Sequence, residues 1–138
     1  MFFKEHGFEF LSNMHPVEIK LPTGEVFSCV ESAYVAHKPQ TLDLRFAELD
    51  GFKAKKLGKT LVLRPDWEQV KIPIMRSLLE IKFNNPQMAQ KLIAVEGEIV
   101  EDNVWHDYFW GRCNGKGENH LGILLMEIRE TLWETIQY

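Results

Sequence analysis

Cysteine is scarce in this 138-residue sequence, and the two residues present, Cys29 and Cys113, form no C-x-x-C pattern. This usage fits a reduced, cytosolic setting. The five histidines lack the H-x-x-x-H spacing of a helical zinc site, so we expect no bound metal. Long apolar runs are also missing, which argues against a membrane-spanning helix, and residues 1–6 do not resemble a signal peptide. The sequence therefore predicts a cytoplasmic protein.

An excess of basic residues is missing too, because 16 lysines and arginines stand against 20 acidic residues, for a formal net charge of -4. The surface as a whole does not indicate binding to nucleic acid or to an acidic membrane, although a local patch still could. Hydrophobic residues make up 45% and charged residues 26%, as in ordinary globular proteins. With no internal repeat and no low-complexity linker, the length predicts one domain over residues 1–138.

Apolar periodicity predicts a mostly helical chain with a hairpin near its N-terminus. Residues 17–21 and 25–28 alternate between apolar and polar side chains, and the proline and glycine at 22–24 are typical of a hairpin turn. Helical patterns follow at 28–38, before Pro39, and at 41–50, which Gly51 is expected to end. A longer helix is expected after Asp66, which could cap it, with a kink or a new start at Pro73 and an end at 84–86. A helix at 87–95, a strand at 98–101 and a helix after Asn119 are expected to follow.

The first expected helix places chemically active side chains on one face. Glu31, Tyr34 and Lys38 follow each other at helical spacing, so a carboxylate, a phenol and an amine share a face. A structural alternative is specific, because Ser28-x-x-Glu31 matches a capping box in which Glu31 only bonds back to the helix start. On pattern alone the capping box is slightly favoured, and the sequence does not separate the two interpretations.

The segment before the last expected helix combines a carboxylate, aromatic rings and glycines. Asp107 lies among four aromatic residues, and a glycine-rich loop at 115–117 leads into the helix, with Asn119 as a candidate N-cap. Free N–H groups at such a helix start suit a phosphate, to which Lys116 could add its charge. The competing interpretation, a surface turn with aromatic residues that serve the core, is about equally favoured.

A basic run lies in the middle of the acidic chain. Residues 51–65 hold five cations and no acidic residue. The run could bind phosphate groups, or it could be the solvated face of a helix, which is the usual meaning of such a pattern. Asn13 could similarly read the edge of a base or only hold an Asx-turn, and the turn is favoured.

Six motifs occur in order along nearly the whole chain. They are FLSN at 10–13, VESAY at 30–34 with Lys38, Trp67, DYFWG at 107–111, GKGxNxLG at 115–122 and LMxxR at 125–129. Together they resemble the NADAR family of N-glycosidases, whose YbiA-like fold is a compact, largely helical α+β domain. The resemblance implies an α+β single domain that is mostly helical, with a small antiparallel sheet near the N-terminus.

The resemblance also implies an activity and roles for three residues. NADAR proteins cleave N-glycosidic bonds, in phosphorylated ribosylamino-pyrimidine intermediates of riboflavin synthesis or in ADP-ribose attached to guanine. Functional roles are implied for Glu31, Trp67 and Asp107. The expected partner is therefore a small phosphoribosyl or ADP-ribosyl molecule, with ADP-ribosylated DNA or nucleotide as a further candidate, and the oligomeric state stays open.

Breaking a ribose C1′–N bond needs stabilisation of positive charge at C1′ and a proton for the departing nitrogen, a logic that parallels glycosidases. Glu31 and Asp107 are the candidate carboxyl groups, and Lys38 could bind phosphate, tune the ionisation of Glu31 or form a Schiff base. No step demands a metal or an organic cofactor. The candidate substrate-binding residues are Asn13, Tyr34, Lys55, Lys56, Lys59, Arg64, Trp67, Trp110, Gly111, Gly115, Lys116, Gly117 and Asn119. The alternative function is a non-catalytic domain that binds ADP-ribose or a related nucleotide.

Overall fold

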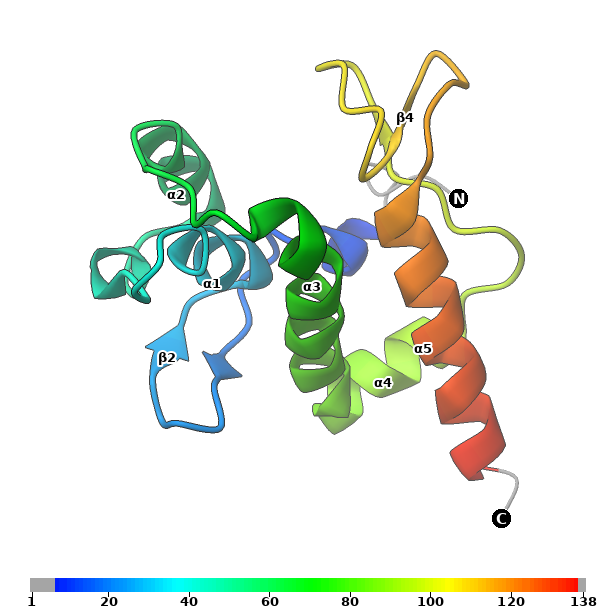
Figure 1. Cartoon of the computed structure of the whole chain (residues 1–138). Helices are drawn as coiled ribbons and strands as arrows, with labels where there is room; N and C mark the ends of the chain where they lie inside the picture. Colours follow the sequence, from blue (N-terminus) through cyan, green and yellow to red (C-terminus); the bar gives the residue numbers. More distant parts are fainter. Residues whose placement is uncertain (1–6, 137–138) are drawn as a thin grey trace. The chain divides into compact units, whose positions relative to one another are not determined.

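The computed structural model describes residues 7–136, and the chain divides into two compact units (Figure 1). The central unit is Asn13–Lys82. The terminal unit combines the segment that ends at Ser12 with the segment that begins at Phe83. The expectation of one domain stays a prediction.

A two-stranded antiparallel hairpin opens the central unit, as predicted. Strand β1 (Ile19–Lys20) pairs with β2 (Val26–Phe27), with Ile19 opposite Phe27. The turn needs a glycine, because Gly24 has a φ of +104°, which other residues rarely adopt. Ile19 and Phe27 both point into the core, since period-2 alternation puts paired positions on one face.

Helix α1 (Val30–Ala36) begins differently from the predicted capping box. Its N-cap is Cys29, whose sulfur accepts the N–H of Ser32 at 3.5 Å. The hydroxyl of Ser28 instead donates to the carbonyl of Leu49 at 2.5 Å. The predicted box between Ser28 and Glu31 is therefore wrong, because the cap lies one residue later and the Glu31 N–H that the box needs donates to the Asn13 carbonyl at 2.9 Å.

The predicted helix at 41–50 is also wrong. That stretch holds only a single 3-10 turn, η2 (Leu44–Phe46), and the true helix α2 (Gly51–Gly58) begins at the residue expected to end one. Asp50 caps α2 by accepting the N–H of Lys53 at 2.8 Å. Gly51 lies against Met14, where an added Cβ would come within 2.6 Å of the methionine Cγ. This glycine serves close packing rather than helix termination.

Helix α3 (Trp67–Asn84) completes the central unit and runs through Pro73 without interruption. Asp66 precedes it, and both oxygens of the Asp66 carboxylate accept from the Arg64 guanidinium, at 2.6 and 3.0 Å. α1 packs beside α2 in Figure 1. The buried core includes Ile19, Phe27, Val30, Val35, Phe46, Ala54, Met75 and Leu78.

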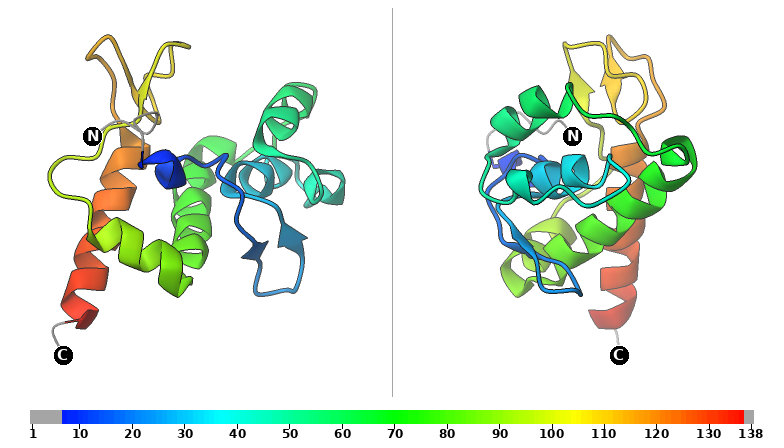
Figure 2. Two further views of the ribbon diagram at one scale, coloured as in Figure 1. Left: turned by 180° about the vertical axis from the view of Figure 1, so that it is seen from behind. Right: turned by 60° about the vertical axis from the view of Figure 1, so that its left-hand side comes forward.

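The terminal unit contains a 3-10 turn, η1 (Glu9–Leu11), and two helices, α4 (Pro86–Ile93) and α5 (His120–Ile136). Asn85 caps α4, with Pro86 in its first turn, which confirms the break expected at 84–86. Strand β3 (Asp102–Asn103) pairs in parallel with β4 (Arg112–Cys113), slightly later than the strand predicted at 98–101. Figure 2 shows the β3 and β4 segments beyond the N-terminal end of α5.

Residues 7–136 thus contain five α-helices and, near the N-terminus, a small antiparallel sheet of two strands, which confirms the predicted α+β class. Across the same residues, none of the helices combines the length and the apolar character that crossing a membrane would require.

Candidate active site

One cluster of predicted residues lies within the central unit, where α1 meets the first turn of α3. The rings of Tyr34 and Trp67 pack with centroids 5.2 Å apart and planes inclined by 52°. The Nζ atom of Lys38 lies 5.7 Å from the centre of the Tyr34 ring, within range of a cation–π contact. The predicted helix ends earlier than Lys38, at Ala36, but the Lys38 side chain still reaches the Tyr34 ring, and Trp67 joins them from α3.

The environment of Lys38 lowers the pKa of its side chain. Burial lowers the pKa of the Lys38 ammonium, and the positive charges of Lys55 and Lys71 lower the pKa further, while the carboxylate of Glu31 opposes the shift. The net direction is downward, so desolvation and like charge outweigh the single carboxylate. An amine of this kind is a better nucleophile at neutral pH than an exposed lysine.

Lys71 was not among the residues predicted from the sequence. It lies one turn after Trp67 on α3, its side chain is only 15% exposed, and its Nζ pairs with Glu68 Oε2 at 2.6 Å. The spacing of four residues from Trp67 was the available signal, because positions i and i+4 share a helix face. Lys71 reads as an ordinary surface lysine until the fold brings α1 and α3 together.

Asn13 joins the same cluster through its backbone. Its carbonyl accepts the N–H of Glu31 at 2.9 Å, so the FLSN segment is fixed to the start of α1. Its side-chain Nδ2 makes only a weak 3.6 Å contact to Met75 Sδ, and its buried Oδ1 has no hydrogen-bond partner within residues 7–136. Buried acceptors are nearly always paired in native proteins, so this oxygen is a candidate contact for a ligand.

The cations of the basic run at 51–65 differ in their exposure and in their partners. The predicted phosphate-binding lysines of the run are all exposed: Lys55, Lys56 and Lys59. The pKa of Lys38 responds to the charge of Lys55, which places Lys55 near the cluster. Arg64 is already held by Asp66 in a two-bond ion pair, and this partner raises the pKa of its guanidinium. Phosphate binding by the run stays a prediction.

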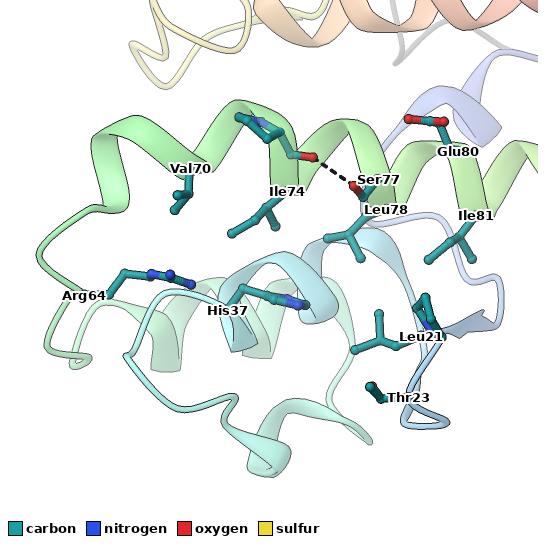
Figure 3. A pocket seen from close by; sticks show the side chains of 12 residues that line it. Leu21, Thr23, His37, Arg64, Val70, Ile74, Ser77, Leu78, Glu80 and Ile81 are labelled. Carbon is teal, nitrogen blue, oxygen red and sulfur yellow. Dashed lines mark hydrogen bonds between the residues drawn. The ribbon is translucent and has the colours of Figure 1, made fainter.

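A separate hollow of about 620 Å³ lies on the central unit (Figure 3). Val70, Ile74 and Leu78 of α3 form an apolar wall, and His37 and Arg64 lie at one end. Arg64 is the one predicted site residue that lines it, and Tyr34, Lys38 and Trp67 are not among the lining residues.

In the terminal unit, Asp107 organises the loop that contains it. One carboxylate oxygen, Oδ1, accepts the backbone N–H groups of Phe109 at 3.1 Å and Trp110 at 2.9 Å. The other oxygen has no hydrogen-bond partner in the described part of the chain and remains able to act on a substrate. The ring of Trp110 packs edge-on against Phe109, with centroids 4.9 Å apart.

The glycine-rich loop forms a tight turn. Asn114 and Gly115 have φ values of 53° and 75°, and Cys113 and Lys116 exchange backbone hydrogen bonds of 2.8 and 3.1 Å across them. Positive φ at both central residues is typical of a type I′ turn, for which Asn-Gly is a preferred pair. The surface-turn interpretation is therefore correct for this part of the loop.

The free N–H groups expected at the start of α5 are absent. The N–H groups of residues 118–121 donate to the carbonyls of residues 108–111, at distances of 2.7 to 3.2 Å. Asn119 has a φ of 54°, and its side chain binds the backbone of Ile99 and Glu101 instead of capping α5. The Asn119 cap is therefore wrong, and the N–H groups of residues 118–121 are not free for a phosphate, because backbone from earlier in the chain accepts them. Phosphate binding by the glycine-rich loop stays a prediction. A phosphate contact from the Lys116 side chain stays a prediction.

The structure thus brings Asn13, Glu31, Tyr34, Lys38 and Trp67 into one cluster, and groups Asp107, Trp110 and Gly111 in another. The expectation that Glu31 and Asp107 share a pocket stays a prediction. Within residues 7–136, no three His, Cys, Asp or Glu side chains are placed to bind a metal ion.

The motifs and the helical fold agree with a match to the NADAR domain over residues 1–133, and the chain belongs to the NADAR family. The chloroplastic riboflavin biosynthesis protein PYRR of Zea mays is 33% identical over 147 residues, which cover 91% of this chain and 23% of that protein. A riboflavin biosynthesis protein of Vibrio vulnificus is 31% identical, over 98% of this chain and 38% of its own length. This chain therefore spans well under half of these relatives.

Two further similarities involve YbiA of Escherichia coli. The N-glycosidase YbiA is 40% identical over 72 residues, which cover 51% of this chain and 45% of YbiA. The NMR structure of YbiA superimposes with a TM-score of 0.84 and 29% identity, over 100% of this chain and 88% of that one. The resemblance read from the six motifs and the expected YbiA-like fold are confirmed.

Proposed function

We propose that this chain is an N-glycosidase that hydrolyses the bond between a phosphorylated ribose and a nitrogen base. The main support is the cluster in which Lys38, with a lowered pKa, lies near Glu31 and beside the Tyr34 ring that packs on Trp67. Membership of the NADAR family and the similarity to a protein named N-glycosidase YbiA point the same way.

Hydrolysis breaks the bond between C1′ of the ribose and the base nitrogen. The bonding pair leaves with the nitrogen, which takes up a proton, and water supplies the oxygen that finishes on C1′. In this proposal the carboxylate of Glu31 stabilises the positive charge that develops at C1′ and accepts a proton from water. Asp107 is the proposed second carboxyl group, acting through the oxygen that its own loop leaves unbonded.

For Lys38 we propose the amine role, in keeping with the burial that lowers the pKa of its ammonium. As the ribose ring opens, the C1′–O4′ bond breaks, O4′ takes the electron pair and a proton from the base amine, and the base nitrogen becomes double-bonded to C1′. The Lys38 amine then adds to C1′, and the base leaves as an amine with the bonding pair and a proton. The resulting imine joins Lys38 to C1′. Water then hydrolyses the imine and returns the free amine and the sugar aldehyde.

Two substrate classes fit this chemistry. One is a ribosylamino-pyrimidine phosphate of the riboflavin pathway, in keeping with relatives named riboflavin biosynthesis proteins. The other is ADP-ribose attached to guanine, free or in DNA. Both present a ribose C1′–N bond, a flat base and phosphate, so they would use the same carboxylates, aromatic rings and cations. A cytoplasmic location is part of the proposal.

The deciding experiment is product analysis on a panel of ribosylamino-pyrimidine phosphates, ADP-ribosylated guanosine and NAD. Release of free base from at least one compound is expected and identifies the class. Tight binding without release across the panel would refute the enzyme and favour the alternative, a non-catalytic ADP-ribose or nucleotide-binding domain.

Glu31→Gln tests the proposed catalytic carboxylate. Because Cys29 caps α1, the change should leave stability almost unaltered, while turnover falls by roughly 10²-fold or more, the scale of general acid–base groups. Glu18→Gln on the exposed surface is the matched control and should keep full turnover. Near-normal turnover by Glu31→Gln would remove Glu31 from the mechanism.

Reduction with borohydride during turnover tests the amine role of Lys38. The imine should be trapped as a stable adduct, located by mass spectrometry on the peptide that contains Lys38 and missing from Lys38→Met. Turnover without any trapped adduct would assign Lys38 to substrate binding instead.

A further inference from the structure

Asn103 holds the backbone of Asp107 from both sides. Its side-chain Oδ1 accepts the Asp107 N–H at 3.0 Å, and its Nδ2 donates to the Asp107 carbonyl at 2.9 Å. The remaining hydrogen of the same amide points to Glu101 Oε2, at 3.1 Å. Asn103 is 3% exposed, so these contacts form away from bulk water.

The Glu101 contact fixes which way the amide faces. A carboxylate oxygen accepts only, so it selects the Nδ2 end of Asn103 and leaves Oδ1 for the Asp107 N–H. Gly111 makes room for this pair, because an added Cβ would overlap Glu101 Oε2 and the Glu101 carbonyl and would come within 2.8 Å of Asn103 Nδ2. Gly111, predicted as a substrate contact, therefore has a structural reason to be glycine.

The neighbouring residue is held in a conformation that needs such support. His106, just before Asp107, has a φ of 64°, a value that residues other than glycine rarely adopt. With Asn103 on its N–H and carbonyl, and with Phe109 and Trp110 on Oδ1, Asp107 is held at backbone and side chain together. These bonds restrict the orientation of the Asp107 carboxylate, and with it the direction in which its second oxygen points.

We infer that Asn103 is a positioning residue that aims the free carboxylate oxygen of Asp107 at the reacting ribose, with Glu101 orienting the Asn103 amide. The inference rests on the proposed function. Asn103 itself touches no reacting atom. Its effect should appear in kcat, because displacement of a catalytic group by about 1 Å can cost on the order of 10²-fold in rate.

The test compares kcat and KM of the whole chain with its Asn103→Ala variant on whichever panel compound the wild type hydrolyses. A loss in kcat of about 10-fold to 100-fold with nearly unchanged KM is expected. Asn85→Ala is the matched control, since it removes another asparagine that bonds backbone N–H groups in the terminal unit, the N-cap of α4. This control should lose stability yet keep its kcat.

Asn103→Asp supplies a second measurement if Asn103→Ala folds poorly. When it is ionised, the new carboxylate cannot donate to Glu101 or to the Asp107 carbonyl, so the bonds that Asn103 Nδ2 makes to both are lost. When protonated, the new carboxyl can donate again. The ratio of its kcat to the wild-type kcat should therefore rise as pH falls, with circular dichroism confirming the fold at each pH.

Wild-type kcat in Asn103→Ala, or a pH-independent ratio in Asn103→Asp, would overturn the inference and leave the proposed N-glycosidase intact. A wild-type chain that releases no base from the panel would overturn the proposed function, and the inference with it.

Discussion

Replacing Gly122 by alanine sets helix propensity against packing. Gly122 is buried in the first turn of α5, where alanine is normally better than glycine by about 1 kcal/mol. An alanine Cβ, however, would overlap the carbonyl oxygen of Ile99 and lie 2.6 Å from Asn119 Oδ1, where ordinary contact begins near 3.4 Å. The methyl group has no flexible neighbour to displace, since one obstacle is backbone and the other is a hydrogen-bonded amide.

The magnitudes favour packing. Overfilling a tight core costs roughly 1–3 kcal/mol. Displacing the Asn119 amide also weakens its bonds to the Glu101 N–H at 3.0 Å and the Ile99 carbonyl at 2.9 Å, each a net contribution of about 0.5–1.5 kcal/mol. After the gain in propensity is subtracted, Gly122→Ala should lower the free energy of unfolding by about 1 to 5 kcal/mol.

Urea titration followed by tryptophan fluorescence and circular dichroism measures this change. Thr131→Ala is the control, because Thr131 is exposed on the same helix and its hydroxyl bonds only to the nearby Glu127 carbonyl. The control should be neutral or slightly stabilising. If Gly122→Ala stabilised the protein as much as propensity alone predicts, the packing argument would be refuted.

Three further predictions concern the central unit. Lys55→Met removes a charge that lowers the pKa of Lys38, so that pKa should rise and the acid limb of kcat should move to higher pH; an unmoved limb would separate Lys55 from the site. Burial lowers the pKa of Lys82 to about 7 from 10.5, so the unfolded chain binds more protons between these values, and the free energy of unfolding should rise with pH across that window. Lys82→Met should flatten that rise in urea titrations at several pH values, and an unchanged slope would contradict the assignment. Trp67→Phe should keep the fold but weaken the stacking of the substrate base and so raise KM. The loss of binding free energy should be less than the roughly 1–3 kcal/mol that a stacked base contributes. An unchanged KM would make Trp67 a core residue only.

Local patterns were sufficient for several features of this protein. Alternation and a glycine turn determined the β1–β2 hairpin, and Asn85 followed by Pro86 determined where α4 begins. Helical spacing alone places Glu31 and Tyr34 on one face of α1, because they lie within one turn of each other, whereas Lys38 lies beyond the end of α1 and reaches the Tyr34 ring from there. The ordered motifs likewise identified the family over nearly the whole chain.

Competition for hydrogen-bonding groups was decided only by the tertiary structure. Ser28 and Glu31 match a capping box in sequence, yet the carbonyl of Asn13, 18 residues before Glu31, accepts the Glu31 N–H that the box needs. Asn119 matches an N-cap, yet the backbone at 99–101 occupies its amide. Each such side chain has several possible partners, and the fold determines which one is within reach.

The same reason applies to the site. Lys71 influences Lys38 because packing brings α3 beside α1, and the Asn103–Glu101 pair fits beside the later loop because Gly111 there has no side chain. The sequence determined which chemical groups are present and which of them share a helix face. The tertiary structure decided which are buried, which are already bonded and which remain available, because burial and hydrogen bonding depend on segments that are distant in the chain.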